Sequence, residues 1–180
     1  MEAGVTEFET ERLRLRRWRE GDADAYARIC ADPEVMRYIT GFPLTREQAE
    51  GQISRFEKAW EERGFGMWAA EEKESGEIVG RIGLLYHHDW PGDDKTEVAW
   101  LLDRSRWGRG FATEGARASL RYGFEEARLE GIISLAVPRN LASRRVMEKA
   151  GLTFRGARRW REVDLVWYAI DRRDWRGANL

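Results

Sequence analysis

The chain has 180 residues, 42% of them hydrophobic and 35% charged, and its formal net charge is −1 at pH 7. This composition describes an ordinary globular protein with a sizeable core, and the balanced charge argues against general binding of polyanions. Cys30 is the only cysteine, which excludes an internal disulfide and a zinc site built on several cysteines.

No stretch approaches the roughly 18 apolar residues of a membrane span, and the N-terminus lacks the apolar core of a signal peptide. We therefore expect a cytoplasmic protein without a membrane partner, folded as one domain over residues 1–180. Residues 19–77 carry 8 basic and 14 acidic side chains, whereas residues 144–162 carry 7 basic and 2 acidic ones. This asymmetry suits a cationic ligand on one side and an anionic ligand on the other, but differing solvated faces account for it nearly as well.

Hydrophobic periodicity and turn residues predict seven strands and four helices. The strands are expected, in chain order, over Arg12–Trp18, Gly66–Glu72, Ile78–Tyr86, Val98–Leu102, Ile132–Val137, Leu152–Arg161 and Val163–Asp171. The helices are expected over Ala23–Cys30, from Thr45 to about Arg63, from Phe111, and over Arg139–Ala150. Asp32-Pro33 caps a further turn through Val35, Met36 and Ile39. Thr45 and Gln48 form a capping box. The order indicates an α+β fold with a mixed sheet.

The loop before the helix that begins at Phe111 has the features of an anion site. Gly108 and Gly110 permit backbone angles that other residues resist. A helix start then directs several main-chain N–H groups, and the positive end of the helix dipole, to one spot that suits phosphate. Positive charge beside this spot comes from Arg104, Arg106 and Arg109. Glycines that merely turn the chain explain the loop alone equally well.

A second helix begins in a similar way after the Ile132–Val137 strand. Asn140 is placed to cap this helix, Ser143 falls in its first turn, and Gly151 follows its end. Taken alone, the pattern describes a capped amphipathic helix as well as it describes a ligand site.

The two helix starts together resemble those of the GNAT superfamily of acetyl-CoA-dependent N-acetyltransferases. WGRGFATEG (Trp107–Gly115) is similar to the coenzyme A pyrophosphate loop of that superfamily, and NLASRRVMEKAG (Asn140–Gly151) is similar to its second characteristic helix. With ETERLRLR, DPEVMRYI and DRRDW, the resemblance extends over about residues 9–175 and is strongest to the RimJ/RimL-like branch, which includes ribosomal-protein N-terminal acetyltransferases. It implies the GNAT acyl-CoA N-acyltransferase fold, with a mostly antiparallel seven-stranded sheet and about four helices.

The resemblance also implies how acetyl-CoA is held, without a metal ion. Amides from Gly108 through Thr113 would bind the pyrophosphate, Leu101 or Leu102 would offer an N–H to the thioester oxygen, and Asn140 would bond the pantetheine arm along the open edge of the Val98–Leu102 strand. The implied cofactor-binding residues are Leu101, Leu102, Trp107, Gly108, Arg109, Gly110, Phe111, Ala112, Thr113, Asn140, Ser143 and Arg145, with Arg144 as the alternative to Arg145 at the outer phosphates.

Acetyl transfer to an amine needs a base, because a free alkylamine has a pKa of about 10. Glu97 is the first candidate, since many GNAT enzymes carry a carboxylate at this place; an ordinary charge on a strand is the alternative interpretation. His87, His88 or a water relay are further alternatives for the base. Ser143 resembles the serine used by this branch beside the leaving thiolate, whereas Met147 stands where many GNAT enzymes have a tyrosine acid.

We therefore expect an N-acetyltransferase, monomeric or homodimeric, that moves the acetyl group of acetyl-CoA to a protein N-terminus or a small cationic amine by direct attack in a ternary complex. The first two helices and the His87–Gly92 loop should form the acceptor side. A non-catalytic acyl-CoA-binding or regulatory module is the alternative, favoured by Met147 and by Arg155 at a position where some relatives carry a glutamate. Nucleic-acid binding through the basic stretch Arg155–Arg161 is not expected in a chain of net charge −1.

Overall fold

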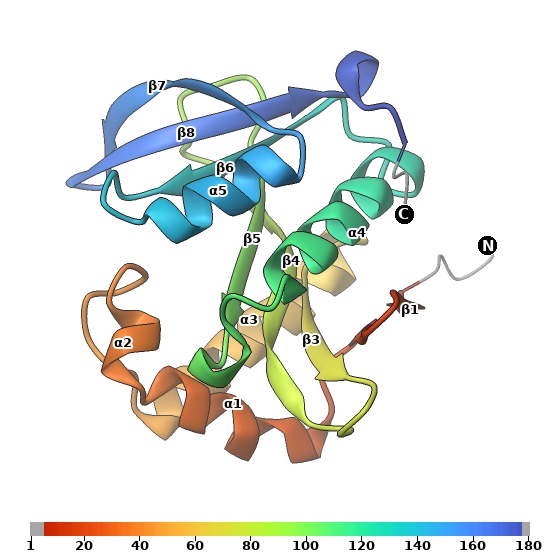
Figure 1. The fold of residues 1–180 in the computed structure, drawn as a ribbon, viewed down its shortest axis with the longest axis vertical. Coiled ribbons are helices and arrows are strands. Elements are labelled where there is room, and N and C mark those ends of the chain that lie inside the picture. The colour runs from red at the N-terminus through yellow and green to blue at the C-terminus, as the bar shows by residue number, and fades with distance from the viewer. Residues whose placement is uncertain (1–5, 178–180) are drawn as a thin grey trace.

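The computed structural model describes residues 6–177, which contain one eight-stranded sheet with helices on both faces (Figure 1). The strands are β1 (Phe8–Glu9), β2 (Leu13–Arg16), β3 (Met67–Glu72), β4 (Ile78–Tyr86), β5 (Thr96–Leu102), β6 (Gly131–Ala136), β7 (Thr153–Trp160) and β8 (Val163–Asp171). The helices are α1 (Ala23–Cys30), α2 (Pro33–Met36), α3 (Arg46–Arg63), α4 (Phe111–Glu125) and α5 (Leu141–Lys149). Between residues 6 and 177, no helix is long and apolar enough to cross a membrane.

Local sequence determines where the longest helix begins and ends. The Thr45 hydroxyl accepts the N–H of Gln48, and the Gln48 side chain accepts the N–H of Thr45, which completes the predicted capping box at the start of α3. Gly64 follows the helix with φ of 73°, a left-handed angle that glycine adopts without strain. Both boundaries confirm the prediction.

The sheet divides between β5 and β6. Its strand order is β1-β2-β3-β4-β5-β6-β8-β7, and β5/β6 is the parallel pair among otherwise antiparallel neighbours. Seven residue pairs join β4 to β5, but a single register pair, Glu97 with Ile133, joins β5 to β6. Figure 1 shows β6, β7, β8 and α5 set apart from β3 and β4. Within the described chain, the part of β5 after Val98 therefore keeps its main-chain edge free on the β6 side.

Each face of the sheet has its own apolar core. Because side chains alternate along a strand, Val98 and Leu102 of β5 face the core that contains Phe111 of α4. Leu101 faces the other core, which contains Tyr26 and other side chains from α1 and α3. The central strand is thus fixed from both sides, and this fixes the position of its free edge.

The fold class matches the prediction, but the number of elements does not: eight strands and five helices replace the seven and four expected. The added strand β1 has two residues, too few for a periodic signal. The fifth helix, α2, is the turn expected after Asp32-Pro33; it is a short helix capped by the Asp32 carboxylate. The strand expected over Arg12–Trp18 ends at Arg16, because the main-chain N–H of Trp18 donates to Glu57 of α3 instead of to a strand.

Candidate functional site

The loop that joins β5 to α4 presents main-chain N–H groups without protein partners. Gly110 has φ of 86°, and no side chain caps the helix that begins at Phe111. The N–H of Glu114 is the first to bond back, to the carbonyl oxygen of Gly110. The amides of Gly108 through Thr113 donate to no other group in residues 6–177. Free donors at the positive end of a helix dipole form the arrangement expected of an anion site.

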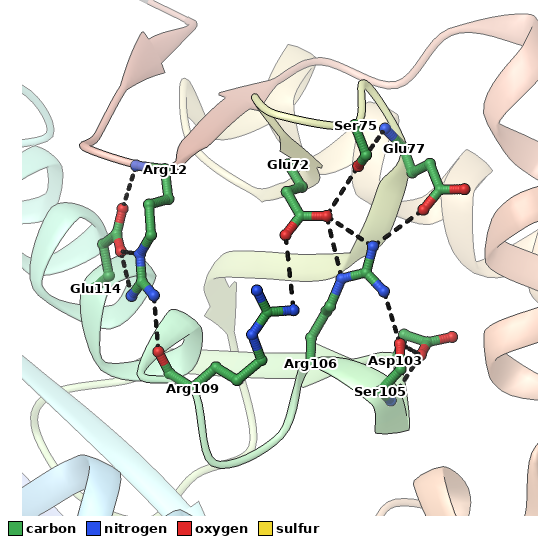
Figure 2. A network of polar contacts seen from close by, with 9 residues as sticks. All are labelled: Arg12, Glu72, Ser75, Glu77, Asp103, Ser105, Arg106, Arg109 and Glu114. Carbon is green, nitrogen blue, oxygen red and sulfur yellow. Dashed lines mark hydrogen bonds and ion pairs between the residues drawn. The ribbon is translucent and has the colours of Figure 1, made fainter.

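Arg106 joins this loop to the hairpin between β3 and β4 (Figure 2). Its Nε and Nη2 atoms donate to Oε2 of Glu72 at 3.1 and 2.6 Å, and Nη2 also contacts Oε2 of Glu77 at 3.0 Å. The hydroxyl of Ser75 donates to the same oxygen of Glu72 at 2.8 Å. The expectation that Arg106 adds free positive charge is therefore wrong, because protein carboxylates neutralise it.

Arg12 joins the other end of the loop to the segment between β1 and β2 (Figure 2). Its main-chain N–H and its Nε atom each donate to the Glu114 carboxylate at 2.8 Å, and its Nη1 atom donates to the carbonyl oxygen of Arg109 at 2.8 Å. The Thr10 hydroxyl also donates to Glu114, at 2.6 Å. Glu114 lies in the first turn of α4, where the dipole favours a negative charge.

These contacts keep both carboxylates ionised. Hydrogen bonds from Arg106 lower the pKa of Glu72. Burial raises the pKa of Glu114, but hydrogen bonds from Thr10 and from the main chain and guanidinium of Arg12 outweigh it, so this pKa is also lowered. The loop is consequently held by charged hydrogen bonds at neutral pH.

Among the three loop arginines, Arg109 has the weakest protein contacts. Its side chain is 51% exposed, and its Nη1 atom lies 4.0 Å from Oε1 of Glu72. Arg104, by contrast, pairs with Asp32 at 3.3 Å. Of the expected loop cations, Arg109 is therefore the one best able to meet an outside anion.

The side chain of Trp107 is bonded to the last residue of β5. Its Nε1 atom donates to the carbonyl oxygen of Leu102 at 3.0 Å, and the side chain stays 47% exposed. Any contact of Trp107 with a ligand thus involves its ring and not its N–H. The side chains of Leu101 and Leu102 are buried on opposite faces, so these residues offer only their main chain to the free edge of β5.

The start of α5 brings Asn140 and Ser143 together, as expected. Oδ1 of Asn140 accepts the N–H of Ser143 at 3.2 Å, so this oxygen caps the helix and the amide NH2 keeps its two donors. Ser143 is half-buried. Met147, one turn further, is 1% exposed and belongs to the core.

The two arginines of α5 differ in their contacts. Nε of Arg144 donates to the Tyr168 hydroxyl and Nη1 donates to the carbonyl oxygen of Pro138, both at 3.1 Å. Arg145 is exposed, and no ion pair joins it to another residue of the described chain. Arg145 is therefore the better placed of the two to meet a phosphate.

Glu97 lies at the point where β5 and β6 separate. Its Oε1 atom accepts the N–H of Leu135 at 3.2 Å, and its Oε2 atom lies 2.6 Å from Nε2 of His87. Only 12% of the Glu97 side chain and 13% of the His87 side chain are exposed. This carboxylate is nearly buried and both of its oxygens have a polar partner, unlike an ordinary solvent-exposed charge on a strand.

The turn between β7 and β8 packs against this pair. The ring of Trp160 meets the rings of His87 and Trp90 edge-on, with centroids 4.9 and 5.4 Å apart. Nε and Nη2 of Arg161 donate to the two carboxylate oxygens of Asp89 at 2.9 and 2.6 Å. The predicted acceptor-side loop, His87–Gly92, is thereby joined to the turn.

The site is defined by a strand edge and two helix starts. A hollow of about 240 Å³ beside the C-terminal segment and another of about 460 Å³ beside α1 are lined by neither Glu97 nor Ser143. In the described part of the chain, no group of three or more His, Cys, Asp or Glu side chains is placed to hold a metal ion.

Three residues lie at the site without having been predicted there. Glu114 has a local signal, because it is an acidic residue in the first turn of a helix that follows a glycine loop. Arg12 and Glu72 have no such signal, since their partners lie 102 and 34 residues away. His87 and Glu97 were candidates separately, and the structure joins them.

Comparisons with known proteins found a matching family and similar sequences and structures. The family model described as acetyltransferase (GNAT) domain matches residues 12–153. The chain is similar to the Bacillus subtilis protein YkkB, with 34% identity over 166 residues that cover 90% of this chain and 94% of that protein. It is also similar to FsC-acetyl coenzyme A-N(2)-transacetylase of Aspergillus fumigatus, with 35% identity over 129 residues that cover 68% and 54% of the two chains. Among solved structures, an acetyltransferase from Agrobacterium tumefaciens is similar at a TM-score of 0.80 and 30% identity, with 92% of this chain and 94% of that chain covered.

Proposed function

The chain belongs to the GNAT family of acetyltransferases, and from this premise we propose that it moves the acetyl group of acetyl-CoA to a primary amine by direct attack in a ternary complex. The observation that carries the proposal is the free main-chain edge of β5, which leads into a helix start whose amides are unpaired. We further propose a single-domain cytoplasmic enzyme that is monomeric or homodimeric.

The residues present fit acetyl-CoA. Gly110 has a left-handed φ, and a Cβ atom added there would lie 3.3 Å from Nη2 of Arg12, so the loop depends on a residue without a side chain. Free amides suit a pyrophosphate, and a free strand edge suits the amide groups of a pantetheine arm. Arg109 and Arg145, both exposed, supply positive charge for the outer phosphates.

The proposed contacts follow from these donors. The amides of Gly108 through Thr113 hold the pyrophosphate, and the N–H of Leu101 or Leu102 faces the thioester oxygen. The NH2 group of Asn140 bonds the pantetheine arm, while the exposed ring of Trp107 flanks the loop. Ser143 completes the set at the start of α5.

Acetyl-CoA, when bound, supplies an activated thioester, and the chain must remove a proton from the amine and stabilise the departing thiolate. The buried carboxylate of Glu97, at the split of the sheet, belongs to the proposed base. Ser143 is the proposed hydrogen-bond donor to the thiolate. Cys30 is buried and burial raises the pKa of its thiol, which argues against a cysteine that carries the acetyl group.

The acceptor is proposed to be a protein N-terminus or a small cationic amine. The acidic segment 19–77, which includes α1 to α3, suits a cation. The motifs similar to the RimJ/RimL-like branch favour a protein N-terminus. Both kinds of acceptor present a primary amine to the same base.

Calorimetry with acetyl-CoA and coenzyme A tests the proposed pyrophosphate site, formed by the amides of Gly108 through Thr113. We expect binding at about micromolar Kd in the wild type, loss of binding in Gly110→Trp, and retention in Gly21→Trp, because Gly21 has open space around it and no left-handed φ. Thiol release with a panel of amines then tests turnover. Absence of binding would contradict the proposed pyrophosphate site. Binding of acetyl-CoA without thiol release for any amine would favour the non-catalytic acyl-CoA-binding module, which Met147 also suits.

A further inference from the structure

We infer that the proton of the acceptor amine is taken by Nδ1 of His87, and that Glu97 is a positioning residue that fixes the orientation and tautomer of this histidine. The inference rests on the proposed function and names the atom that acts as its base. Three observations support it: the contacts of Glu97, the hydrogen bond of His87, and the place of both in the sheet.

Both oxygens of Glu97 are already engaged. Oε1 accepts the N–H of Leu135 on β6, and Oε2 contacts Nε2 of His87. The side chain is 12% exposed and is held between two elements. A carboxylate that accepts a proton here would give up one of these bonds, so Glu97 is poorly suited to take the proton itself.

The contact at 2.6 Å indicates which nitrogen of His87 carries a hydrogen. An ionised carboxylate only accepts hydrogen bonds, so Nε2 must carry the hydrogen. In a neutral imidazole the other nitrogen, Nδ1, then holds the lone pair. Nδ1 makes no hydrogen bond to any residue of the described chain, which leaves it available to an amine.

The position of the pair matches the end of the proposed acetyl-CoA path. Glu97 and Ile133 are the register pair of β5 and β6, and the free edge of β5 begins after the next residue, Val98. Ser134 Oγ donates to the carbonyl oxygen of Val98 at 2.8 Å, so side-chain bonds mark the start of the split. Glu97 of the pair therefore lies on the strand that would carry the thioester, four residues before Leu101, and the acceptor amine would bind between His87 and that thioester.

Two further contacts fix the position of His87. Its main-chain N–H donates to the carbonyl oxygen of Lys95 at 2.8 Å, and Trp160 packs edge-on against its ring. The neighbouring His88 is exposed and has none of these side-chain contacts. Of the two histidines that the sequence offers, the structure therefore selects His87.

The proton and electron pairs balance as follows. The ammonium form of the acceptor gives one proton to Nδ1 of His87, and the freed lone pair forms a C–N bond with the acetyl carbon. The C–S bond breaks, and its electron pair leaves on sulfur. The second amine proton goes to the thiolate beside Ser143, and the imidazolium returns its proton to solvent. No oxidant, reductant or metal is required.

Chemical rescue in the full-length protein tests the assignment. We expect His87→Gly to lower kcat/KM by about 10²–10⁴-fold, with free imidazole restoring part of the rate. Glu97→Gln should also lower the rate, because its amide can donate to Nε2 and move the hydrogen to Nδ1, but imidazole should not restore it. Glu125→Gln, at an exposed position of α4 outside the proposed site, is the control and should keep the wild-type rate. Full activity in His87→Gly, or its loss without rescue in a variant that still binds acetyl-CoA, would overturn the inference.

A second measurement does not depend on turnover. In ¹⁵N-NMR spectra of the imidazoles, we expect His87 to carry its hydrogen on Nε2 in the wild type and on Nδ1 in Glu97→Gln. A wild-type spectrum with the hydrogen on Nδ1 would contradict the inference even if no amine in the panel is accepted. Calorimetry with acetyl-CoA distinguishes failure of the proposed function from failure of this inference. If the proposed function is wrong, acetyl-CoA does not bind; if only the assignment of His87 as the base is wrong, acetyl-CoA still binds.

Discussion

Arg12 and Glu114, 102 residues apart, form a charged pair in which Nη2 of the arginine lies 2.7 Å from Oε2 of the glutamate. The same arginine donates to the carbonyl oxygen of Arg109, so it joins the N-terminal segment to the loop and to the first turn of α4. Glu114 also receives the Thr10 hydroxyl. The free amides of the loop are thus positioned by a contact that no neighbouring residue in the sequence supplies.

Replacing Glu114 by glutamine should weaken both the fold and acetyl-CoA binding. The amide would place an N–H donor against the guanidinium of Arg12, and we expect the free energy of unfolding to fall by about 1–3 kcal/mol. Denaturant unfolding measures this change, and calorimetry measures the affinity. Glu125→Gln, at an exposed position of the same helix, is the control and should stay within about 0.5 kcal/mol of the wild type. Equal stabilities would show that the pair contributes nothing.

The same carboxylate predicts a pH dependence of stability. The folded-state pKa of Glu114 lies below its ordinary value of 4.5, so the unfolded chain binds the proton more readily. Its contribution to stability is therefore fully present above about pH 4.5 and is lost as pH falls through the lowered pKa. Unfolding free energies measured from about pH 6 to about pH 3 should converge for the wild type and Glu114→Gln. A constant difference over this range would contradict the prediction.

Much of the fold could be predicted because its signals are local. The capping box at Thr45, the left-handed Gly64 and the apolar run of β5 each lie within a few residues of the boundary that they define. The element that was not predicted is β1, with two residues. Elements this short depend on pairing or packing partners, which the local pattern does not contain.

The site divides in the same way. Its main-chain part follows from glycines at a helix start, so Gly110 could be recognised in the sequence. Its side-chain part depends on the folded chain: Arg106 was expected to add positive charge beside the loop, but Glu72 and Glu77 neutralise this charge. The link between His87 and Glu97 likewise needs the β4–β5 pairing, which brings the end of one strand to the start of the next.

Glycine 115 permits the close approach of α4 to the sheet, and Gly115→Ala should be destabilising. A Cβ atom there would lie 2.3 Å from Cδ1 and 3.0 Å from Cγ2 of Ile82, which is fully buried. We expect a loss of about 1–3 kcal/mol in the free energy of unfolding. Gly51→Ala, in α3, is the matched control: it meets only a side-chain nitrogen of Arg55 at 3.8 Å and should stabilise by about 0.5–1 kcal/mol. Thermal or denaturant unfolding measures both changes. A Gly115→Ala variant more stable than the wild type would contradict the close packing of α4 against Ile82.

Trp107→Phe should loosen the loop while keeping an aromatic ring there. The substitution removes the hydrogen bond from Nε1 to the carbonyl oxygen of Leu102, at the end of β5. Because this bond aligns the loop with the strand, we expect the Kd for acetyl-CoA to rise several-fold, equivalent to about 1 kcal/mol. Calorimetry gives the Kd and denaturant unfolding gives the stability. An unchanged Kd would mean that the ring alone maintains the loop.

Asp89→Asn should disturb the acceptor side and leave the cofactor side intact. The two hydrogen bonds from Arg161 lower the pKa of Asp89 to about 2, so the pair is charged throughout the neutral range. Asparagine keeps one acceptor oxygen but loses the charge and the two-oxygen contact, and the β7–β8 turn should then hold His87 less firmly. We expect a higher KM for the amine in thiol-release assays, with an unchanged Kd for acetyl-CoA by calorimetry. Arg159→Gln is the control, because Arg159 pairs with Glu162 and Asp164 at the same turn without contacting the His87 loop. Equal effects of the two substitutions on KM would show that the turn responds to its total charge and not to the contact with Asp89.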